Sequence, residues 1–188
     1  DPSTGSNRCQ FYTTGPTTVS GAVNIPAGYQ VTLYINGSVT ISGNITYAGP
    51  TGKFNPTNRA NIPYFAIVTK GNIYLTNSVT RLDGLYVAQP SPTAAGKFET
   101  CDSPDIQSTS QCTNQLTING AVVAQYVELL RSHGSSQPLG CNPRCDINGI
   151  GTAPAEIINF VPSMILGAPG FSALPNSPQG LVSLPPVF

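Results

Sequence analysis

Residues Gln30–Tyr47, QVTLYINGSVTISGNITY, decide the fold class of this chain, because apolar and polar residues alternate along them. The apolar set on one face of an extended chain is Val31, Leu33, Ile35, Val39, Ile41, Ile45 and Tyr47. A period of two is typical of β-strands with one buried face. We therefore expect short strands here, with Asn36-Gly37 between two of them.

The same pattern returns in Tyr64–Gln89 and in Leu116–Arg131, and a shorter strand is expected over Thr18–Ile25. Polar segments rich in Gly, Pro, Asn and Thr separate these blocks, as loops do between strands. No long window carries the 3.6-residue period of a helix. The sequence therefore predicts an all-β fold.

The blocks also resemble one another. Asn36-Gly37, Lys70-Gly71 and Asn119-Gly120 each place a glycine just before an apolar strand, and Gly84–Gln89 nearly repeats as Gly120–Gln125. Short strands that recur after glycines favour a β-solenoid, similar to a parallel β-helix, in which each coil stacks its apolar face on the next. A β-sandwich, which also has short strands and regular turns, is the alternative.

Composition limits the classes of function. Of 188 residues, 39% are hydrophobic and only 9% are charged, which suits one folded domain. Eight basic and eight acidic residues give a formal net charge of zero. Neither nucleic acid binding nor membrane insertion is expected, because there is no basic surface stretch and no long apolar helix.

Five cysteines indicate disulfides and an oxidising compartment. The expected pairs are Cys101 with Cys112, and Cys141 with Cys145, each within a polar loop. Cys9 is then either free or bonded to another chain. Zinc is the competing interpretation, but the spacings fit no standard zinc site. The expected disulfides therefore predict a secreted, extracellular or cell-surface protein, and a start at Asp-Pro suits its processed mature form.

The chain divides into three expected regions. Residues 1–29 form an extended N-terminal arm with a first short strand, residues 30–152 form the solenoid, and residues 153–188 form a Pro/Gly-rich apolar tail. The tail must cover its apolar side chains on its own subunit or on a neighbour. Its expected assembly residues are Ile165, Leu166, Phe171, Leu174, Leu181, Val182, Leu184, Val187 and Phe188.

No arrangement of residues points clearly to catalysis, so we expect no enzyme activity, no cofactor and no metal. Asp83 and Glu128 lie in matching blocks and form the one candidate carboxylate pair, but isolated strand-end charges are the favoured interpretation. His133 follows Ser132 without a nucleophile motif, which is typical of a turn histidine.

Four stretches, IPYFAIVTKGNIYL, VTRLDGLYVAQ, QLTINGAVVAQYVELLRSHG and PAEIINFVPSMIL, carry a resemblance to a known group. Over roughly residues 30–168 the chain resembles uncharacterised, predicted surface β-solenoid proteins of candidate-phylum bacteria. The resemblance implies export and a solenoid fold, and supplies no catalytic residues.

Two functions remain. The first is a structural subunit of an extracellular filament or surface layer, whose partner is a copy of itself joined head-to-tail through the terminal segments. The second is a monomeric adhesin or carbohydrate-binding module that binds surface glycans. The aromatic residues that would stack on sugar rings are Tyr12, Tyr64, Tyr74, Tyr86 and Phe98.

Overall fold

A computed structural model describes residues 7–48, 62–102, 112–131 and 154–161 of the chain. Within these ranges the chain forms strands and no helix, which confirms the all-β prediction. The strands are β1 (Arg8–Thr14), β2 (Thr17–Val19), β3 (Val23–Ile25), β4 (Gln30–Asn36), β5 (Val39–Ile41), β6 (Ile45–Tyr47), β7 (Tyr64–Lys70), β8 (Ile73–Leu75), β9 (Arg81–Gln89), β10 (Lys97–Glu99), β11 (Leu116–Ala124), β12 (Tyr126–Glu128) and β13 (Glu156–Asn159).

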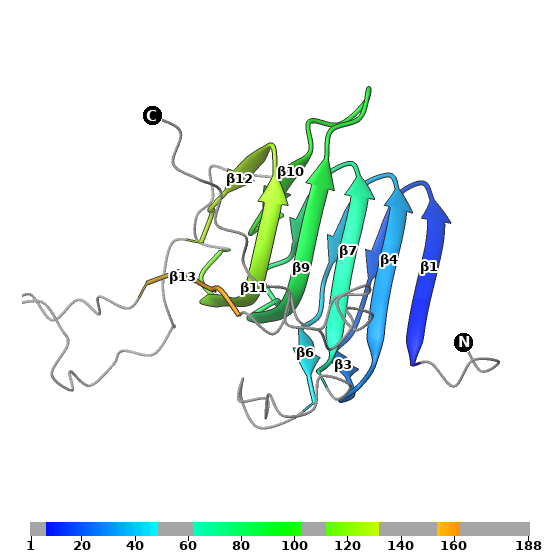
Figure 1. Cartoon of the computed structure of the whole chain (residues 1–188). Coiled ribbons are helices and arrows are strands. Elements are labelled where there is room, and N and C mark those ends of the chain that lie inside the picture. The colour runs from blue at the N-terminus through cyan, green and yellow to red at the C-terminus, as the bar shows by residue number, and fades with distance from the viewer. Residues whose placement is uncertain (1–6, 49–61, 103–111, 132–153, 162–188) are drawn as a thin grey trace, which may run out of the picture.

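The strands form two sheets (Figure 1). The larger sheet has eight strands, in the order β1-β4-β7-β9-β11-β13 with β3 and β6 beside that path, and the smaller has the order β12-β10-β8-β5-β2. Every ladder between these named strands is parallel. A β-sandwich of the immunoglobulin type would instead be built from antiparallel ladders.

Three parallel ladders account for all these pairings. Ladder A contains β1, β4, β7, residues 85–89 of β9 and residues 121–124 of β11. Ladder B contains β2, β5, β8, β10 and β12. Ladder C contains β3, β6, residues 81–83 of β9, residues 116–119 of β11, and β13. The described chain passes through ladders A, B and C in that order five times. We call each pass, which contributes one strand to every ladder, a circuit.

The first two circuits are in strict register. The partners Arg8↔Gln30, Thr17↔Val39 and Val23↔Ile45, one from each ladder, are all 22 residues apart. The segment expected as an arm with one short strand therefore contains three strands that repeat residues 30–47. Its polar, Thr-rich character comes from its place at the end of the ladders, where its side chains stay partly exposed.

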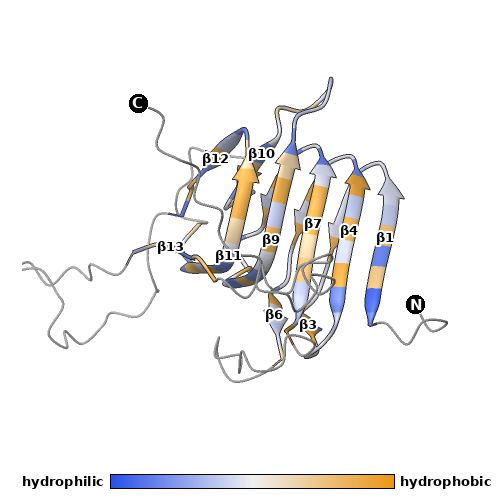
Figure 2. Cartoon of the chain, in the orientation of Figure 1, coloured by the Kyte–Doolittle hydropathy of each residue, from blue (hydrophilic) through white to orange (hydrophobic). Residues whose placement is uncertain are grey.

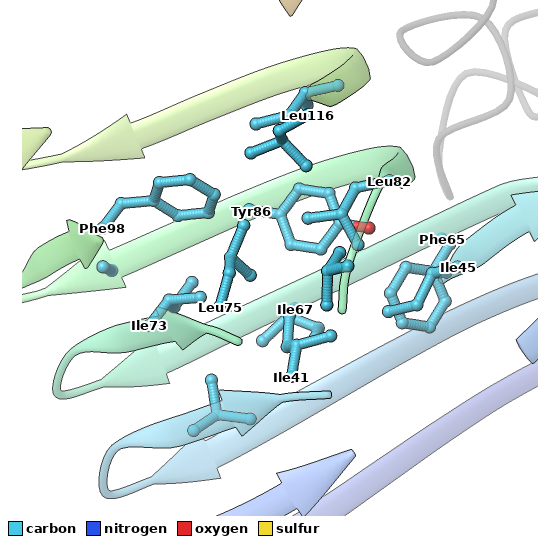
Figure 3. Packing of buried hydrophobic residues seen from close by; sticks show 14 of the residues in the cluster. Ile41, Ile45, Phe65, Ile67, Ile73, Leu75, Leu82, Tyr86, Phe98 and Leu116 are labelled. Carbon is cyan, nitrogen blue, oxygen red and sulfur yellow. The ribbon is translucent and has the colours of Figure 1, made fainter. Parts of the chain in front are cut away.

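The core lies between the ladders (Figure 3). Hydrophobic segments recur along neighbouring strands of the larger sheet (Figure 2). The strand register aligns the inward-facing residues of one circuit with those of the next. Tyr86 and Phe98 are both fully buried, with ring centroids 6.2 Å apart. Burial of this kind contributes about 25 cal/mol for each Å² of apolar surface removed from water.

Glycines make the corners of the circuits possible. A Cβ on Gly37 would lie 2.6 Å from the backbone of Gly15, and one on Gly71 would lie 2.7 Å from Gly37. A Cβ on Gly43 would lie only 1.9 Å from the backbone carbonyl oxygen of Gly21. The predicted glycine-before-strand motif is thus a corner at Gly37 and Gly71. Gly120 differs, because it lies inside β11 opposite Gly84.

Replacing Gly43 by Ala should destabilise the fold by about 3 kcal/mol, because the new methyl group would meet backbone rather than a movable side chain. Gly21→Ala is the matched control. A Cβ there meets nothing within 4 Å, so only the left-handed φ of +76° opposes it, at a cost of about 1–2 kcal/mol. Urea unfolding measures both variants, and a smaller loss for Gly43→Ala than for Gly21→Ala would contradict this packing.

Candidate functional site

On each ladder, one row of inward-facing side chains runs through all five circuits. Row A is Phe11, Leu33, Ile67, Tyr86 and Val122. Row B is Thr17, Val39, Ile73, Phe98 and Val127. Row C is Val23, Ile45, Leu82, Ile118 and Ile158. The third and fourth members of every row are buried, whereas the end members are exposed or half-buried. Within the part of the chain that the structure describes, the core is therefore open at both ends.

At the first end, β1, β2 and β3 each pair on one side only within the described residues. Phe11 occupies a core position and is still 55% exposed, because no further circuit among the described residues covers it. Tyr12 points outward and is 73% exposed. One face of its ring stacks on Tyr34, with centroids 4.9 Å apart and planes 11° from parallel. This end presents an unpaired strand edge together with apolar and aromatic surface.

At the opposite end, the fifth circuit exposes an apolar surface from all three ladders. Val123 is 54% exposed, Val127 45% and Ile158 48%. Tyr126, Leu129 and Phe160 are also exposed around them. Unpaired edges of this kind are sites at which further strands add. The two end circuits together form the candidate functional site.

One corner of this second end is closed by Arg131, which is buried. Its guanidinium donates hydrogen bonds of 2.7–3.1 Å to five backbone carbonyls and to the side chain of Asn77. The carbonyls belong to Thr76, Asn77, Val79, Thr100 and Asn114. Burial lowers the pKa of Arg131, and the nearby charge of Glu156 opposes that shift. Arg131 thereby joins the loops of three circuits.

Asp83, a predicted acid–base candidate, is buried and fully engaged. Arg81 donates to both of its carboxylate oxygens, at 3.0 and 2.8 Å. The backbone N–H of Tyr47 and the side-chain amide of Asn119 donate to it at 2.9 and 2.8 Å. The side-chain amide of Asn159 donates in turn to Asn119, at 3.1 Å. Asp83 therefore has a structural role along ladder C, and the prediction of an isolated strand-end charge is wrong for it.

Glu128, the other member of that candidate pair, lies in the smaller sheet, away from the carboxylate network of Asp83. It stands directly opposite Glu99 in the β10–β12 register. The Lys97 ammonium lies 2.7 Å from the Glu128 carboxylate and 3.8 Å from that of Glu99. Burial, and next the charge of Glu128, raise the pKa of Glu99. Lys97 therefore offsets the repulsion between the carboxylates of Glu99 and Glu128, which stand opposite each other on neighbouring strands.

A shallow groove of about 300 Å³ crosses the carboxyl ends of ladder A. Tyr12, Tyr34 and Val68 line its apolar part, while Lys70 and Gln89 are among the polar side chains at its margin. Lys70 is exposed and forms no ion pair with the described residues. The groove therefore combines a stacked pair of tyrosines with one positive charge.

The predicted binding aromatics divide into exposed and buried groups. Tyr12 is exposed and Tyr74 is half-buried, as a binding role requires. Tyr64, Tyr86 and Phe98 are buried, so the prediction that they are available to a ligand is wrong. They stand at strand positions that face the core or the neighbouring strand, where large aromatic side chains contribute packing.

The disulfide Cys101–Cys112 is present and buried, which confirms that predicted pair and is consistent with an oxidising location. Closing this loop stabilises the fold by about 3 kcal/mol. Cys9 is a free, half-buried cysteine on β1. Cys141, Cys145, His133 and the nine predicted tail residues lie outside the described residues.

Within the described ranges, no helix is long and apolar enough to cross a membrane, and no group of three or more metal-ligating side chains gathers. The sequence did not single out Arg131 or Glu99. A sequence repeat does predict the end circuit formed by β1 to β3. Residues 14–25 match residues 36–47, with Gly15 and Gly21 aligned to Gly37 and Gly43.

Comparison with known proteins finds no matching family model, no matching curated protein and no matching solved structure.

Replacing Glu99 by Gln should raise thermal stability at neutral pH. Because the pKa of Glu99 is raised on folding, the native protein holds its proton at a higher pH than the unfolded chain does. Stability from this group is thus greatest at acidic pH and falls as pH rises through the folded pKa. The gain of Glu99→Gln over the parent chain, followed by calorimetry, should shrink as pH falls toward 4.5, the ordinary value for the group. A gain that does not change with pH would contradict this assignment.

Proposed function

We propose that this chain is a β-solenoid subunit of an extracellular filament or surface layer, and that copies assemble head-to-tail through their two end circuits. The observation that carries the proposal is the pattern of burial along the three rows. Apolar side chains are buried in the middle of each row, while Phe11 at one end and Val127 and Ile158 at the other remain exposed.

Exposed strand edges and apolar ends favour association. A solenoid needs its terminal coils capped or stacked, because their backbone groups and core side chains otherwise face water. The two ends of this chain differ, so a contact between them joins unlike surfaces. Such a contact need not close into a ring, and it then produces a fibre.

The charge of the chain is compatible with polymerisation. Eight basic and eight acidic residues leave a net charge of zero, so stacked copies accumulate no net repulsion. The disulfide Cys101–Cys112 suits an oxidising, extracellular location for the polymer. Secretion, the absence of enzyme activity and membership of the surface solenoid proteins belong to this same proposal.

Two charged variants test the head-to-tail contact. Tyr12→Lys places a charge on the first end and Val123→Lys places one on the second, and each variant alone should remain monomeric. An equimolar mixture should form dimers and stop there, because each variant retains the end that the other has lost. Sedimentation velocity measures the species, and Thr93→Lys, on an exposed loop between β9 and β10, should assemble like the parent chain.

Either variant forming dimers alone would show contact between like ends, and unaltered polymers would exclude the end circuits as joints. A further variant lacking residues 165–188 tests the predicted role of the apolar tail, which lies outside the described residues. Loss of assembly would give the tail a part in the joint, whereas filaments that form as before would exclude it.

A second function, glycan binding by a monomer, is favoured by the groove over Tyr12 and Tyr34. Lys70 gives this groove a positive charge, so the ligand that fits best is an oligosaccharide with a carboxylate or sulfate group. The outer face of the Tyr12 ring offers a surface for stacking against a sugar.

Binding of acidic and neutral oligosaccharides by titration calorimetry tests this second function. Lys70→Gln should weaken binding of an acidic glycan about tenfold, the effect of one charge-assisted hydrogen bond, and should leave neutral glycans unaffected. Gln89→Ala, at the same groove without a change of charge, is the control. If no glycan binds the parent chain at millimolar concentration, this function is excluded.

A further inference from the structure

We infer that the joint between copies continues the three ladders in the register they already have within one chain. The inference rests on the proposed function and specifies its contact residues. In this joint β1 of one copy pairs in parallel with residues 121–124 of the next. Tyr12 then lies opposite Val123, Thr17 opposite Val127, and Val23 opposite Ile158.

The two ends are complementary because each carries one strand of every ladder. The first end presents β1, β2 and β3, and the second presents residues 121–124, β12 and β13. A copy placed one strand spacing beyond the last circuit, about 4.8 Å away, meets a strand of the same direction at all three positions. Rows A, B and C then run on through the joint, and their exposed end members become interior members.

Polar side chains on ladder C add specificity to this register. The side-chain amide of Asn159 donates to Asn119, and that of Asn119 donates to the carboxylate of Asp83. These hydrogen bonds already connect three circuits along one position of the ladder. In the first circuits that same position holds Thr46 and, beside it, the exposed Asn24. The joint places Asn24 next to Asn159, where the chain of side-chain amides can continue.

Tyr12 supplies a similar continuation on the outer face of ladder A. Its position runs through Tyr34, Val68 and Val87 to Val123. One ring face of Tyr12 is occupied by Tyr34, and the residue as a whole is 73% exposed. Val123, 54% exposed at the other end, covers the second ring face in the joint. A shift of the register by one residue would turn these side chains toward opposite faces.

Disulfide trapping measures the register directly. In a background in which Cys9, Cys141 and Cys145 are replaced by Ser, the pair Tyr12→Cys and Val123→Cys should yield a ladder of covalent multimers on mild oxidation, because opposite Cα atoms on paired strands lie about 5 Å apart. The pair Gln10→Cys and Val123→Cys, displaced by two residues on the same face, is the matched control and should give at least tenfold less. Each single cysteine variant should give no species larger than a dimer.

The outcomes separate this inference from the proposed function. Filaments in which the displaced pair cross-links better, or in which neither pair does, would overturn the register and leave head-to-tail assembly standing. A chain that stays monomeric before oxidation would overturn both.

Hydrogen exchange on the unmodified chain provides a measurement that needs no variant. The carbonyl of Asn36 accepts from the N–H of Gly15, and the carbonyl of Asn7 accepts from the N–H of Gln30. The backbone N–H and C=O groups of odd-numbered residues along β1 therefore point toward β4. The N–H groups of Gln10 and Tyr12 therefore point to the free edge. Assembly should protect them at least tenfold, and unchanged exchange in filaments would exclude β1 from the joint.

Discussion

The parallel pairing of each circuit with its neighbours is the constraint on which the structure depends. A β-strand has hydrogen-bonding groups on both edges, so a strand inside a ladder is satisfied only when a circuit lies on each side. The 22-residue repeat shared by Arg8↔Gln30, Thr17↔Val39 and Val23↔Ile45 meets this demand on three ladders at once. Among the described residues, the same demand is unmet at the outer edges of the first and fifth circuits.

Other features follow from the close approach of successive circuits. The corner at Gly37 stacks on Gly15, and the corner at Gly71 stacks on Gly37, so tightly that a side chain on Gly37 or Gly71 would strike the backbone of the previous corner. Where a loop interrupts the repeat, buried polar side chains form the hydrogen bonds that connect neighbouring circuits. Arg131 binds backbone carbonyls of the loops after β8 and β10, and Asp83 fixes the position at which β9 passes from ladder C to ladder A.

Much of the fold could be predicted from alternation and glycine spacing alone. The blocks Gln30–Tyr47 and Tyr64–Gln89 are strands, and the near-repeat of Gly84–Gln89 in Gly120–Gln125 is a true register match, residue for residue. The polar composition of the segment before residue 30 predicts an arm with one short strand, because it obscures the 22-residue repeat of Gly15 and Gly21 in Gly37 and Gly43. Local alternation shows which side chains of a strand face inward, but it does not show to which circuit the strand belongs.

The candidate site was harder to predict, because exposure depends on position within the stack. Phe11 and Tyr86 occupy the same row, yet Phe11 is largely exposed and Tyr86 is fully buried. No local pattern separates them; only the number of circuits on either side does. The same holds for Arg131, whose partners are 17 to 55 residues away in sequence.

The axial rise of the assembled filament, determined by electron cryomicroscopy, tests the central claim that end circuits stack as further circuits. Each ladder holds five strands in the described chain, so in-register stacking predicts a rise of about 24 Å per subunit, with strands perpendicular to the filament axis. Strands that run along the axis, a rise unrelated to five strand spacings, or particles that remain single under all conditions would contradict it.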